Sequence, residues 1–415
     1  MLDINLIRNN PELVKNGIAK KNINSKIVDD FLILDDEWRK ITKESEDLRA
    51  EQKKLGAERK IEKAKELKNK IQILESDLKL LEIRRDELLS LLPNLPFEDV
   101  PIGKDESENK VLRQIGKKPD FPAEYGFEPK DYLEIGQNLN LIDTERAAKV
   151  SGSRFGYLKG QAALLEFALI KLAFDTLIPE GFIPIIPPVM IKPESYREIG
   201  RLAAGQEEER YYLQKDNLYL VGSSEHSIGP MHKDEIFEER DLPKKYLGFS
   251  TCFRREAGSY GKDTRGILRV HQFDKVEMFS FVKPEDSEKE LKYLLSLQEK
   301  LMQKLELPYQ IVEICTGDMG WTDNRQYDVE VWIPAQKKYR ETNSASNTGD
   351  FQTRGINCRY RKESGQKIEF AHALNATAFA IGRMIIAIIE NYQTKEGTIL
   401  VPKVLQDYLG TTEIK

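Results

Sequence analysis

The sequence predicts an α+β protein in two parts: an N-terminal antiparallel two-helix coiled-coil arm, and a larger domain in which helices flank an antiparallel β-sheet. Residues 28–92 contain a single glycine, Gly56, and no proline, which is what two long helices joined by one tight turn require. Beyond residue 100, short β-rich segments alternate with a few helical ones and are separated by glycine and proline. We therefore expect one domain over residues 1–100 and a second over residues 101–415.

Each predicted arm helix carries a narrow seam of side chains at alternating steps of three and four residues. In the first helix the seam comprises Val28, Phe31, Asp35, Trp38, Ile41, Ser45, Leu48, Gln52 and Leu55. In the second helix it comprises Ile61, Ala64, Lys68, Ile71, Leu74, Leu78, Leu81, Arg85, Leu88 and Leu92. A short connection brings two such seams together antiparallel. Helices of ~30 residues at ~1.5 Å per residue give an arm about 45 Å long.

The tip of this arm is strongly basic. Residues 53–70 hold eight basic and three acidic side chains, a net charge of +5, although the whole chain has a net charge of −5. The basic residues are Lys53, Lys54, Arg59, Lys60, Lys63, Lys65, Lys68 and Lys70. Two interpretations are open: a solvated hairpin supported by i,i+4 ion pairs, or an electrostatic grip on a phosphate backbone without base readout.

Composition argues against several classes of protein. The 415 residues include 64 basic and 69 acidic ones, which argues against a protein that coats nucleic acid through its overall charge. No segment resembles a signal peptide or approaches ~18 apolar residues, so we expect a cytoplasmic protein that does not contact a membrane. The three cysteines, Cys252, Cys315 and Cys358, lie far apart, and the four histidines lack metal-motif spacing. A disulfide framework or a zinc site is therefore poorly supported.

The segment after Leu92, PNLPFEDVPIGKDESEN, is rich in proline and acidic residues, which is typical of a linker. Further on, residues 161–177 predict a helix that ends before Pro179. The next segment, GFIPIIPPVMI, predicts a strand whose prolines belong at a sheet edge or an interface.

A long hairpin follows in the segment LGFSTCFRREAGSYGKDTRGILRVHQFDKVEMFSF, where two β-rich runs flank a glycine-rich basic loop. Period-two alternation places Arg254 and Glu256 on one face of the first strand. It places Phe273, Lys275 and Glu277 on one face of the second. A guanidinium and two carboxylates can then converge above one sheet. The alternative is a surface ion-pair ladder on a half-exposed sheet.

The last third of the chain predicts another strand pair, YDVEVWIP followed by KKYRETNSASN. The segment FAHALNATAFAIGRMIIAIIENYQ predicts a short strand that leads into an apolar helix with one arginine, Arg383, near its start. Because a buried charge needs a partner, Arg383 forms either a structural ion pair or an anion clamp.

These segments resemble, nearly word for word, the signature motifs of the class II aminoacyl-tRNA synthetases, and of the seryl-tRNA synthetases among them. GFIPIIPP is similar to motif 1, which forms the dimer interface of the family. CFRREAGSYGKDTRG with RVHQFDKVEMF is similar to motif 2, and LNATAFAIGR to motif 3. The resemblance runs along the whole chain, and the joint order of the motifs is highly specific. It implies a class II antiparallel sheet in an enzyme that activates serine with ATP and esterifies it to tRNA.

The resemblance implies ATP and Mg²⁺ as the cofactors. Arg254 is expected to bind the α-phosphate, Glu256 the adenine amino group and Arg383 the far end of the nucleotide. Glu341 and Ser344 match metal-contacting positions, with Mg²⁺ held mainly by nucleotide oxygens. The implied ATP-binding residues are Arg254, Arg255, Glu256, Val270, Glu341, Thr342, Asn343, Ser344 and Arg383, and the implied catalytic residues are Arg254, Glu277 and Arg383.

The resemblance also implies a serine pocket made of polar groups. Such groups select the hydroxyl of serine over alanine, because they stay unpaired with the wrong substrate. The implied residues are Ser223, Ser224, Glu225, Arg254, Glu277, Asn375 and Thr377. At three places the chain departs from common family patterns: Ser-Ser-Glu replaces Thr-x-Glu at residues 223–225, Asn343 stands where serine is frequent, and Asn-Ala-Thr replaces the common Asn-Gly-Ser at residues 375–377 while keeping a hydroxyl.

By resemblance the arm binds the long variable arm of serine tRNA, held by the other subunit of a homodimer. Selenocysteine tRNA is left open as a second acceptor. The implied tRNA-binding residues are Lys53, Lys54, Arg59, Lys60, Lys63, Lys262 and Arg265.

Two alternatives stay open beside the active enzyme. A synthetase-like paralogue lacking tRNA charging would be indicated by loss of Arg254, Glu256, Glu277 or Arg383, and all four are present. A structural coiled-coil protein would leave the catalytic motifs unexplained.

Overall fold

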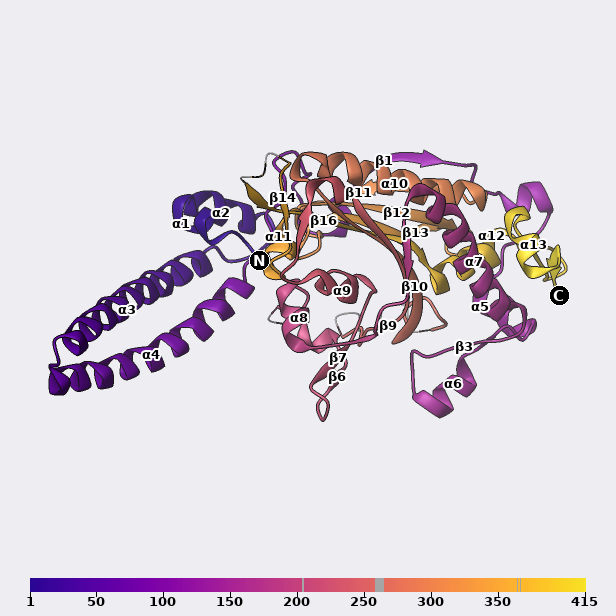
Figure 1. The fold of residues 1–415 in the computed structure, drawn as a ribbon. Coiled ribbons are helices and arrows are strands. Elements are labelled where there is room, and N and C mark those ends of the chain that lie inside the picture. The colour runs from indigo at the N-terminus through magenta and orange to yellow at the C-terminus, as the bar shows by residue number, and fades with distance from the viewer. Residues whose placement is uncertain (204, 258–264, 364, 366) are drawn as a thin grey trace. The chain divides into compact units, whose positions relative to one another are not determined.

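The computed structural model describes residues 1–415 except residue 204, residues 258–264, and residues 364 and 366 (Figure 1). The described chain divides into two compact units, Met1–Leu95 and Pro96–Lys415. Their boundary falls at the start of the segment that the sequence predicts to be a linker. Within the described ranges, no helix combines the length and the apolar character needed to cross a membrane.

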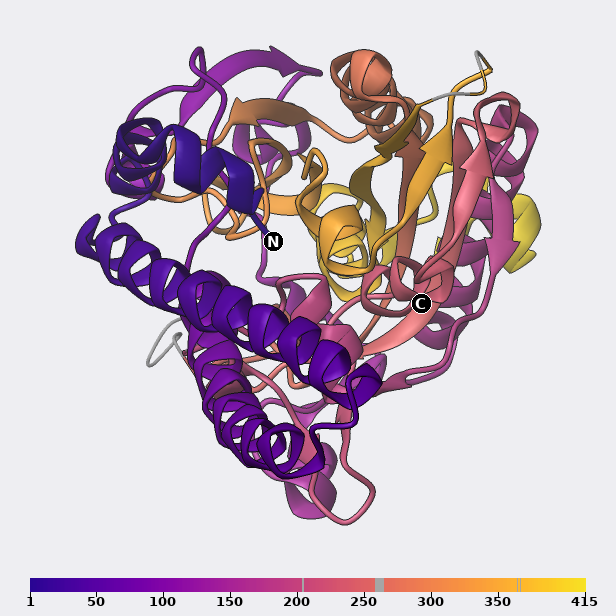
Figure 2. The same cartoon turned by 60° about the vertical axis from the view of Figure 1, so that its left-hand side comes forward.

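Two long helices lie side by side in the first unit (Figures 1 and 2). Its helices are α1 (Ile4–Asn9), α2 (Pro11–Ala19), α3 (Lys26–Ala57) and α4 (Ile61–Ser90). The predicted pair of long helices is confirmed. The chain reverses over residues 58–60, where Arg59 adopts a left-handed conformation with φ of 59°. Gly56 itself lies inside the last turn of α3, so the reversal does not depend on its conformational freedom.

The long helices bury few side chains. The buried ones are Val28, Phe31, Asp35 and Ser45 on α3, and Ile71, Leu81 and Leu89 on α4. Asp35 is tolerated in this seam because Arg8 donates to both of its carboxylate oxygens, at 2.7 and 2.8 Å, and Arg85 lies 3.8 Å away. Two predicted seam positions, Ile61 and Lys68, are exposed, Ile61 to 71%. Ile61 is the first residue of α4, just beyond the end of α3.

An eight-stranded sheet dominates the second unit, and its strand order is β1-β11-β12-β13-β16-β10-β9-β4. In that order the strands are Lys110–Ile115, Tyr309–Glu313, Arg325–Ile333, Lys338–Asn347, His372–Ala380, Gln272–Val282, Lys244–Phe253 and Ile183–Ile185. All neighbouring pairs are antiparallel except β4 with β9. The predicted antiparallel sheet is confirmed, with the proline-containing β4 at one edge.

The described helices of the second unit are all shorter than α3 and α4. They are α5 (Tyr132–Asn138), α6 (Thr144–Ser151), α7 (Gln161–Leu177), α8 (Pro193–Glu198), α9 (Glu225–Ile228), α10 (Ser287–Lys304), α11 (Phe351–Gly355), α12 (Ile381–Asn391) and α13 (Gln406–Leu409). Small sheets are formed by β2 (Ile142–Asp143) with β3 (Tyr157–Leu158), and by β17 (Ile399–Leu400) with β18 (Glu413–Ile414). Two others combine β5 (Met190–Ile191), β7 (Leu218–Leu220) and β6 (Tyr212–Leu213), and β15 (Ile368–Phe370), β14 (Arg359–Arg361) and β8 (Ile236–Glu238). The helix predicted over residues 161–177 coincides with α7.

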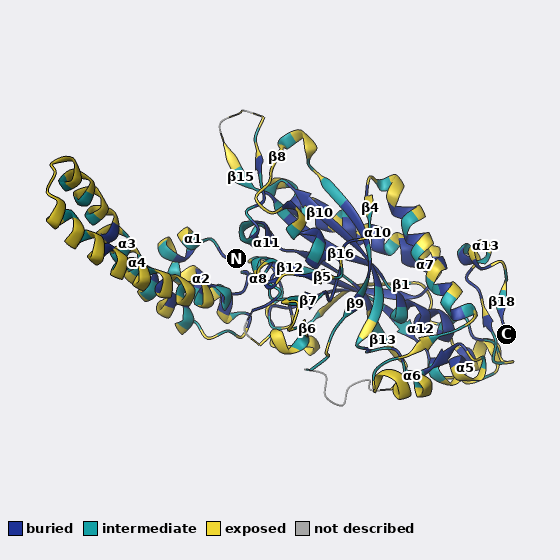
Figure 3. Ribbon diagram, turned by 60° about the horizontal axis from the view of Figure 1, so that its bottom comes forward, coloured by how far each residue is buried: buried dark blue, intermediate teal, exposed yellow. Residues whose placement is uncertain are grey.

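Helices α7, α10 and α12 pack against one face of the large sheet and share a hydrophobic core with it. Alternation along each strand divides its side chains between this core and the opposite face. In β10, Val276 and Met278 belong to the core, so Lys275 and Glu277 point to the other side. Figure 3 shows the strands of this sheet largely buried, whereas α3 and α4 present many exposed residues. The opposite face, which α9 and α11 contact, carries the polar side chains Lys275 and Glu277.

Candidate active site

A cavity of about 440 Å³ lies on the face of the large sheet opposite helices α7, α10 and α12. Its walls come from β10, β13, β16, the start of α12, and the segments next to β9 and α9. Twelve residues that the sequence selects line it: Ser223, Glu225, Arg254, Glu256, Val270, Glu277, Glu341, Thr342, Ser344, Asn375, Thr377 and Arg383. The structure therefore brings together positions that are up to 160 residues apart in sequence.

Strand bulges decide which side chains reach the cavity. Val329 and Glu330 of β12 pair with Asn343 and Glu341, so Thr342 is an extra residue on β13. Because of this extra residue, Glu341 and Thr342 both line the cavity although they are neighbours in sequence. A second irregularity, between Val276 and Glu277, leaves an extra residue on β16.

Arg254 and Glu256 lie just beyond β9, whereas the sequence predicts them on the pleated face of that strand. The backbone N–H of Arg254 donates to the carbonyl of His271 at 3.0 Å, which continues the hairpin by one step. Two residues later Glu256 adopts a φ of 52°, and its carboxylate lies 3.4 Å from the guanidinium of Arg269. The guanidinium of Arg254 donates to the carbonyl oxygen of Gly222, at 3.3 Å from Nε and 3.2 Å from Nη2.

Arg383 is paired with Glu341 across the cavity floor. Its Nη1 donates to the backbone carbonyl of Glu341 at 2.9 Å and lies 3.0 Å from the carboxylate of the same residue. This guanidinium, helped by Arg254 and Arg269, lowers the pKa of Glu341. Both options that the sequence left open for Arg383 are compatible with this geometry, because the ion pair stands at a cavity wall.

At the other end of the cavity, Glu225 lies in a cluster of buried polar groups that we call the Glu225 cluster: Tyr196, Arg201, Glu225 and His226. Arg201 Nε lies 2.8 Å and His226 Nε2 3.4 Å from the carboxylate. Burial would raise the pKa of Glu225, but Arg201, His226 and Lys275 outweigh it, and the net shift is downward. Glu225 is therefore ionised at neutral pH.

His226 is held neutral inside this cluster. Burial lowers the pKa of His226 to about 3. Its Nδ1 accepts from the backbone N–H of Gly222 at 3.1 Å and lies 2.9 Å from the hydroxyl of Tyr196. An accepting Nδ1 leaves the proton on Nε2, which faces Glu225.

Glu277 forms the second acidic centre of the cavity. Its carboxylate lies 2.8 Å from Lys275 Nζ, and both side chains are almost fully buried. Burial raises the pKa of Glu277, and Lys275 partly offsets that rise. Nearby, the side-chain nitrogen of Asn375 is buried and has no hydrogen-bond partner within the described part of the chain. The cavity thus offers an amide donor that no described protein group uses.

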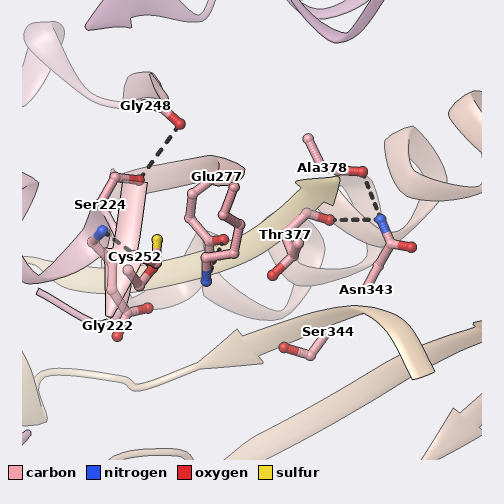
Figure 4. Close-up of polar contacts among 12 residues, drawn as sticks. Gly222, Ser224, Gly248, Cys252, Glu277, Asn343, Ser344, Thr377 and Ala378 are labelled. Atoms are coloured by element: carbon pink, nitrogen blue, oxygen red, sulfur yellow. Dashed lines mark hydrogen bonds and ion pairs between the residues drawn. The ribbon is translucent and has the colours of Figure 1, made fainter. Parts of the chain in front are cut away.

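Three of the selected residues do not line the cavity. Asn343 faces the opposite side of β13 and donates to the carbonyls of Thr377 and Ala378, at 3.0 and 2.6 Å (Figure 4). Ser224 is turned towards β9, where its hydroxyl lies 3.5 Å from the carbonyl of Gly248 (Figure 4). Arg255 is exposed. Asn343 and Ser224 therefore contact the backbone of neighbouring strands and not the cavity.

The residues selected for RNA contact lie elsewhere. Lys53, Lys54, Arg59, Lys60 and Lys63 are all exposed, around the turn between α3 and α4. Arg265 lines a second cavity, together with Tyr132 and Arg340. Lys262 lies outside the described residues.

Several cavity residues were not predicted from the sequence, among them Arg201, Arg210 and Asp323. Arg201 and Arg210 flank a glycine- and glutamate-rich segment that resembles an exposed loop and contains no motif. In the sequence, only their proximity to the Ser-Ser-Glu motif at residues 223–225 indicated that they could lie near the cavity. Lys275 had been placed on the correct face, but without a role.

In the described part of the chain, the side chains of the cavity would need further ligands from a bound molecule to hold a metal ion. Among the described residues, no three His, Cys, Asp or Glu side chains cluster as a metal site. Glu341 and Ser344 offer one carboxylate and one hydroxyl, both hard oxygen donors of the kind Mg²⁺ prefers. These residues fit a Mg²⁺ ion whose remaining ligands come from phosphate oxygens and water.

The fold and the cavity define a class II aminoacyl-tRNA synthetase. Residues 210–392 match the family model described as "tRNA synthetase class II core domain (G, H, P, S and T)". A prolyl-tRNA synthetase from Giardia lamblia, 17% identical with a TM-score of 0.59 over 70% of this chain and 56% of its own, shares the fold alone.

More similar proteins identify the family within that class. Residues 1–96 match the "Seryl-tRNA synthetase N-terminal domain". A serine–tRNA ligase of Dictyoglomus turgidum is 44% identical over 100% of this chain and 99% of its own. A crystal structure of seryl-tRNA synthetase from Pyrococcus horikoshii complexed with ATP has a TM-score of 0.91 at 41% identity, over 100% of this chain and 99% of its own. A serine–tRNA ligase of Naegleria fowleri in complex with AMP has a TM-score of 0.88 at 33% identity, with the same coverage of both chains. The chain belongs to the seryl-tRNA synthetase family.

Proposed function

We propose that the chain is a serine–tRNA ligase. It activates L-serine with ATP to seryl-adenylate and pyrophosphate, and then transfers serine to the 3′ end of serine tRNA. The observation that carries the proposal is one cavity that brings together Arg254 and Arg383 with Glu225 and Glu277, two carboxylates that are each paired with a cation. Such a cavity is suited to a nucleotide phosphate beside an amino acid. No side-chain nucleophile is required, because the carboxylate of serine itself attacks the α-phosphorus.

Cations in the cavity provide most of the catalytic effect. As serine attacks, the bond between the α-phosphorus and the pyrophosphate oxygen breaks, and negative charge develops on phosphate oxygens. Arg254 is placed to neutralise the α-phosphate and Arg383 the far end of the nucleotide. The adenine amino group is assigned to Glu256, and the remaining nucleotide contacts to Val270 and Thr342. Preorganised cations lower the barrier because they need no rearrangement during the reaction.

Mg²⁺ is the proposed metal. It would be held by Glu341 and Ser344 and would neutralise phosphate charge when bound. The lowered pKa of Glu341 keeps that carboxylate ionised and available as a ligand.

Serine binds at the end of the cavity that holds the Glu225 cluster. The carboxylate of Glu225, whose pKa is lowered, and that of Glu277, which lies 2.8 Å from Lys275 Nζ, are suited to its ammonium group, whereas Ser223, Asn375 and Thr377 are suited to its polar groups. Asn375 has a buried donor free for this purpose within the described residues. Alanine leaves such groups unpaired, which disfavours it.

The N-terminal arm is the proposed tRNA grip. Its exposed basic tip can neutralise phosphates without reading bases, which suits recognition of a long variable arm by shape. Lys53, Lys54, Arg59, Lys60 and Lys63 are assigned to this contact, and Lys262 and Arg265 to the acceptor end. Selenocysteine tRNA is the second RNA to test against the same surface.

We further propose a homodimer in which the arm reaches the tRNA held by the partner. The edge strand β4 and helix α7 expose apolar side chains that a monomer has no reason to expose: Leu164 (49%), Phe167 (67%), Ile183 (52%) and Ile186 (80%). An unpaired edge with apolar neighbours favours association with a second copy. Light scattering of Phe167→Glu is expected to report monomers where the unmodified chain forms dimers.

The cytoplasm is the proposed location. Cys252, Cys315 and Cys358 are all free and buried, as is usual in a reducing compartment.

ATP–pyrophosphate exchange with each amino acid tests the activity, followed by charging of serine and selenocysteine tRNA transcripts. We expect exchange with serine alone and charging of serine tRNA. Absence of serine-dependent exchange would contradict the proposal. Exchange without charging would favour a paralogue that loads another carrier.

A further inference from the structure

Arg210 is a cavity residue for which the described protein offers no partner anion. It precedes β6, and its guanidinium carbon lies 5.6 Å from the centroid of the Tyr196 ring. Its Nε atom is buried and has no hydrogen-bond partner within the described residues. Nor does Arg210 form an ion pair within 4.0 Å of a carboxylate in that part of the chain, although Tyr196 and Glu209, its neighbour in sequence, both act to raise its pKa. A cation in this position is incomplete without a ligand.

Gly222 joins Arg210 to Arg254. The carbonyl oxygen of Gly222 accepts from Arg254, and a Cβ atom on Gly222 would lie 3.2 Å from Arg210 Nη1. The missing side chain leaves the space that the Arg210 guanidinium occupies. Two guanidinium groups, which we call the arginine pair, therefore flank one glycine at the cavity wall.

The arginine pair has excess positive charge. Three acids that line the cavity with Arg210 lie close to other cations: Glu225 is 2.8 Å and Asp323 3.9 Å from Arg201, and Glu277 is 2.8 Å from Lys275. Arg210 also faces Arg201, besides Tyr196 and Glu209. Burial lowers the pKa of Arg210, and the like charges of Arg254 and Arg201 lower it further. An anion between the arginines relieves this repulsion.

We propose that Arg210 binds the carboxylate of the amino-acid substrate, so that Arg254 remains available for the α-phosphate of the nucleotide. This inference rests on the proposed function. Serine is a zwitterion, and the cavity separates its charges: the engaged acids face the ammonium end and the arginine pair faces the carboxylate end. A substrate held in this way presents a carboxylate oxygen towards the α-phosphorus.

The reaction predicts where Arg210 contributes. One carboxylate oxygen forms a bond to the α-phosphorus, the bond to the pyrophosphate oxygen breaks, and pyrophosphate leaves with its electron pair. The carboxylate loses its negative charge in the mixed anhydride. The contact with Arg210 is therefore strongest in the ground state, and its loss raises the KM for serine more than it lowers kcat.

Steady-state ATP–pyrophosphate exchange tests this division. For Arg210→Gln we expect the KM for serine to rise about 10- to 100-fold, and the KM for ATP to change less than about threefold. Arg113→Gln, the same change at an exposed ion pair with Glu299, is the matched control and should match the unmodified chain. A KM for serine within about twofold of the unmodified value would overturn the proposal, and so would equal rises for serine and ATP.

Binding of serine and serinamide separates a carboxylate contact from a structural role. Serinamide keeps the ammonium and hydroxyl groups but has no negative charge. The unmodified chain should bind serine more tightly than serinamide, and in Arg210→Gln this preference should fall at least about tenfold. Weakening of both ligands by the same factor would indicate that Arg210 only packs against Tyr196, and would overturn the proposal.

If Arg210→Gln does not fold, the same binding measurements are made with Arg210→Lys. It keeps the charge but loses the planar fork, so the preference for serine over serinamide should fall about three- to tenfold. An unchanged preference in this variant would overturn the inference while leaving the proposed function intact. If the unmodified chain shows no exchange with serine, the proposed function itself fails.

Discussion

The arm and the catalytic body use the same charged residue types in opposite ways. At the arm tip, Lys60 and Glu58 are paired at 2.7 Å, but their side chains are 56% and 41% exposed. In the cavity, Lys275 and Glu277 are paired at 2.8 Å with exposures of 8% and 2%. Water screens the first pair, which is worth at most about 1 kcal/mol. The buried pair is not screened, and losing one partner would leave an isolated buried charge.

This difference teaches where single residues matter. In the cavity of the body, buried charges such as Lys275 and Glu277 have specific partners, so we expect one substitution to have a large effect. In the arm, the proposed phosphate contact is shared by many exposed charges, so we expect single substitutions to have small effects and several to be needed together. The following predictions test this contrast.

The largest effect is expected for Arg254→Ala in the body. Removing a preorganised cation from developing phosphate charge should reduce serine-dependent exchange about 10²- to 10³-fold. Arg49→Ala, the same substitution at an exposed arm ion pair with Glu75, is the control and should leave exchange unchanged. Comparable losses of exchange activity in the two variants would contradict the proposed difference between the arm and the body.

Deletion of residues 30–90 should separate the two activities. We expect charging of serine tRNA to fall about 100-fold or more, because the tRNA loses its main electrostatic contact. Exchange should stay within about twofold, since the deleted residues belong to the first compact unit and the cavity to the second. Parallel measurement of exchange and charging checks this, and equal loss of both would contradict a two-part organisation.

Within the arm, burial should decide stability. Ile71 is 5% exposed and Ile61 is 71% exposed, and both lie on α4. Ile71→Ala should lower the free energy of local unfolding by about 2–4 kcal/mol, whereas Ile61→Ala should change it by less than about 0.5 kcal/mol. Amide hydrogen exchange of α4 in the full chain measures both. Similar decreases in the free energy of unfolding for the two variants would mean that the buried seam extends to the tip of the arm.

Combined removal of tip charge should weaken RNA binding by a smaller amount. Replacing Lys53, Lys54 and Lys63 with glutamine should lower affinity for serine tRNA about tenfold at moderate salt. The slope of log K against log salt should fall by about 0.9 for each phosphate that the tip no longer neutralises. Replacing Lys40 and Lys43, in the middle of α3, is the control. A tip variant with the salt slope of the control would exclude the tip as the phosphate-binding surface.

The smallest effect is a pH dependence of stability centred on His226. Its folded pKa of about 3 lies below its ordinary value of 6.5, so the unfolded chain binds the extra proton. Stability is therefore lost as pH falls below 6.5, by at most about 1.4 kcal/mol per pH unit. Thermal unfolding between pH 7.5 and 5.5 should show a steeper decline for the unmodified chain than for His226→Gln. Parallel curves would show that His226 does not stay neutral in the fold.

Local patterns predicted much of the fold. The three–four spacing and the lack of proline predicted the two long helices, and the helix at residues 161–177 was predicted to the residue. Such patterns work because the contacts that stabilise a helix lie three and four positions away in sequence. The turn was less well predicted, since Arg59 and not Gly56 has the left-handed conformation.

The sequence motifs predicted most of the selected residues that line the cavity, but not all of its lining residues. Alternation correctly placed Phe273, Lys275 and Glu277 together. Asn343 could not be placed in this way, because an extra residue at Thr342 interrupts the alternation of β13. A bulge depends on how two strands pair, and one strand does not contain that information.

The sequence by itself determined the family, the helical arm with its basic tip, and the main polar residues of the site. Only the tertiary structure decided that Arg201 holds Glu225, that His226 stays neutral, and that Gly222 leaves room for Arg210 beside Arg254. The physical reason is the distance along the chain between the residues that interact. Helix periodicity and motif order are set by neighbours in sequence, whereas burial, ion pairing and pKa are set by neighbours in space.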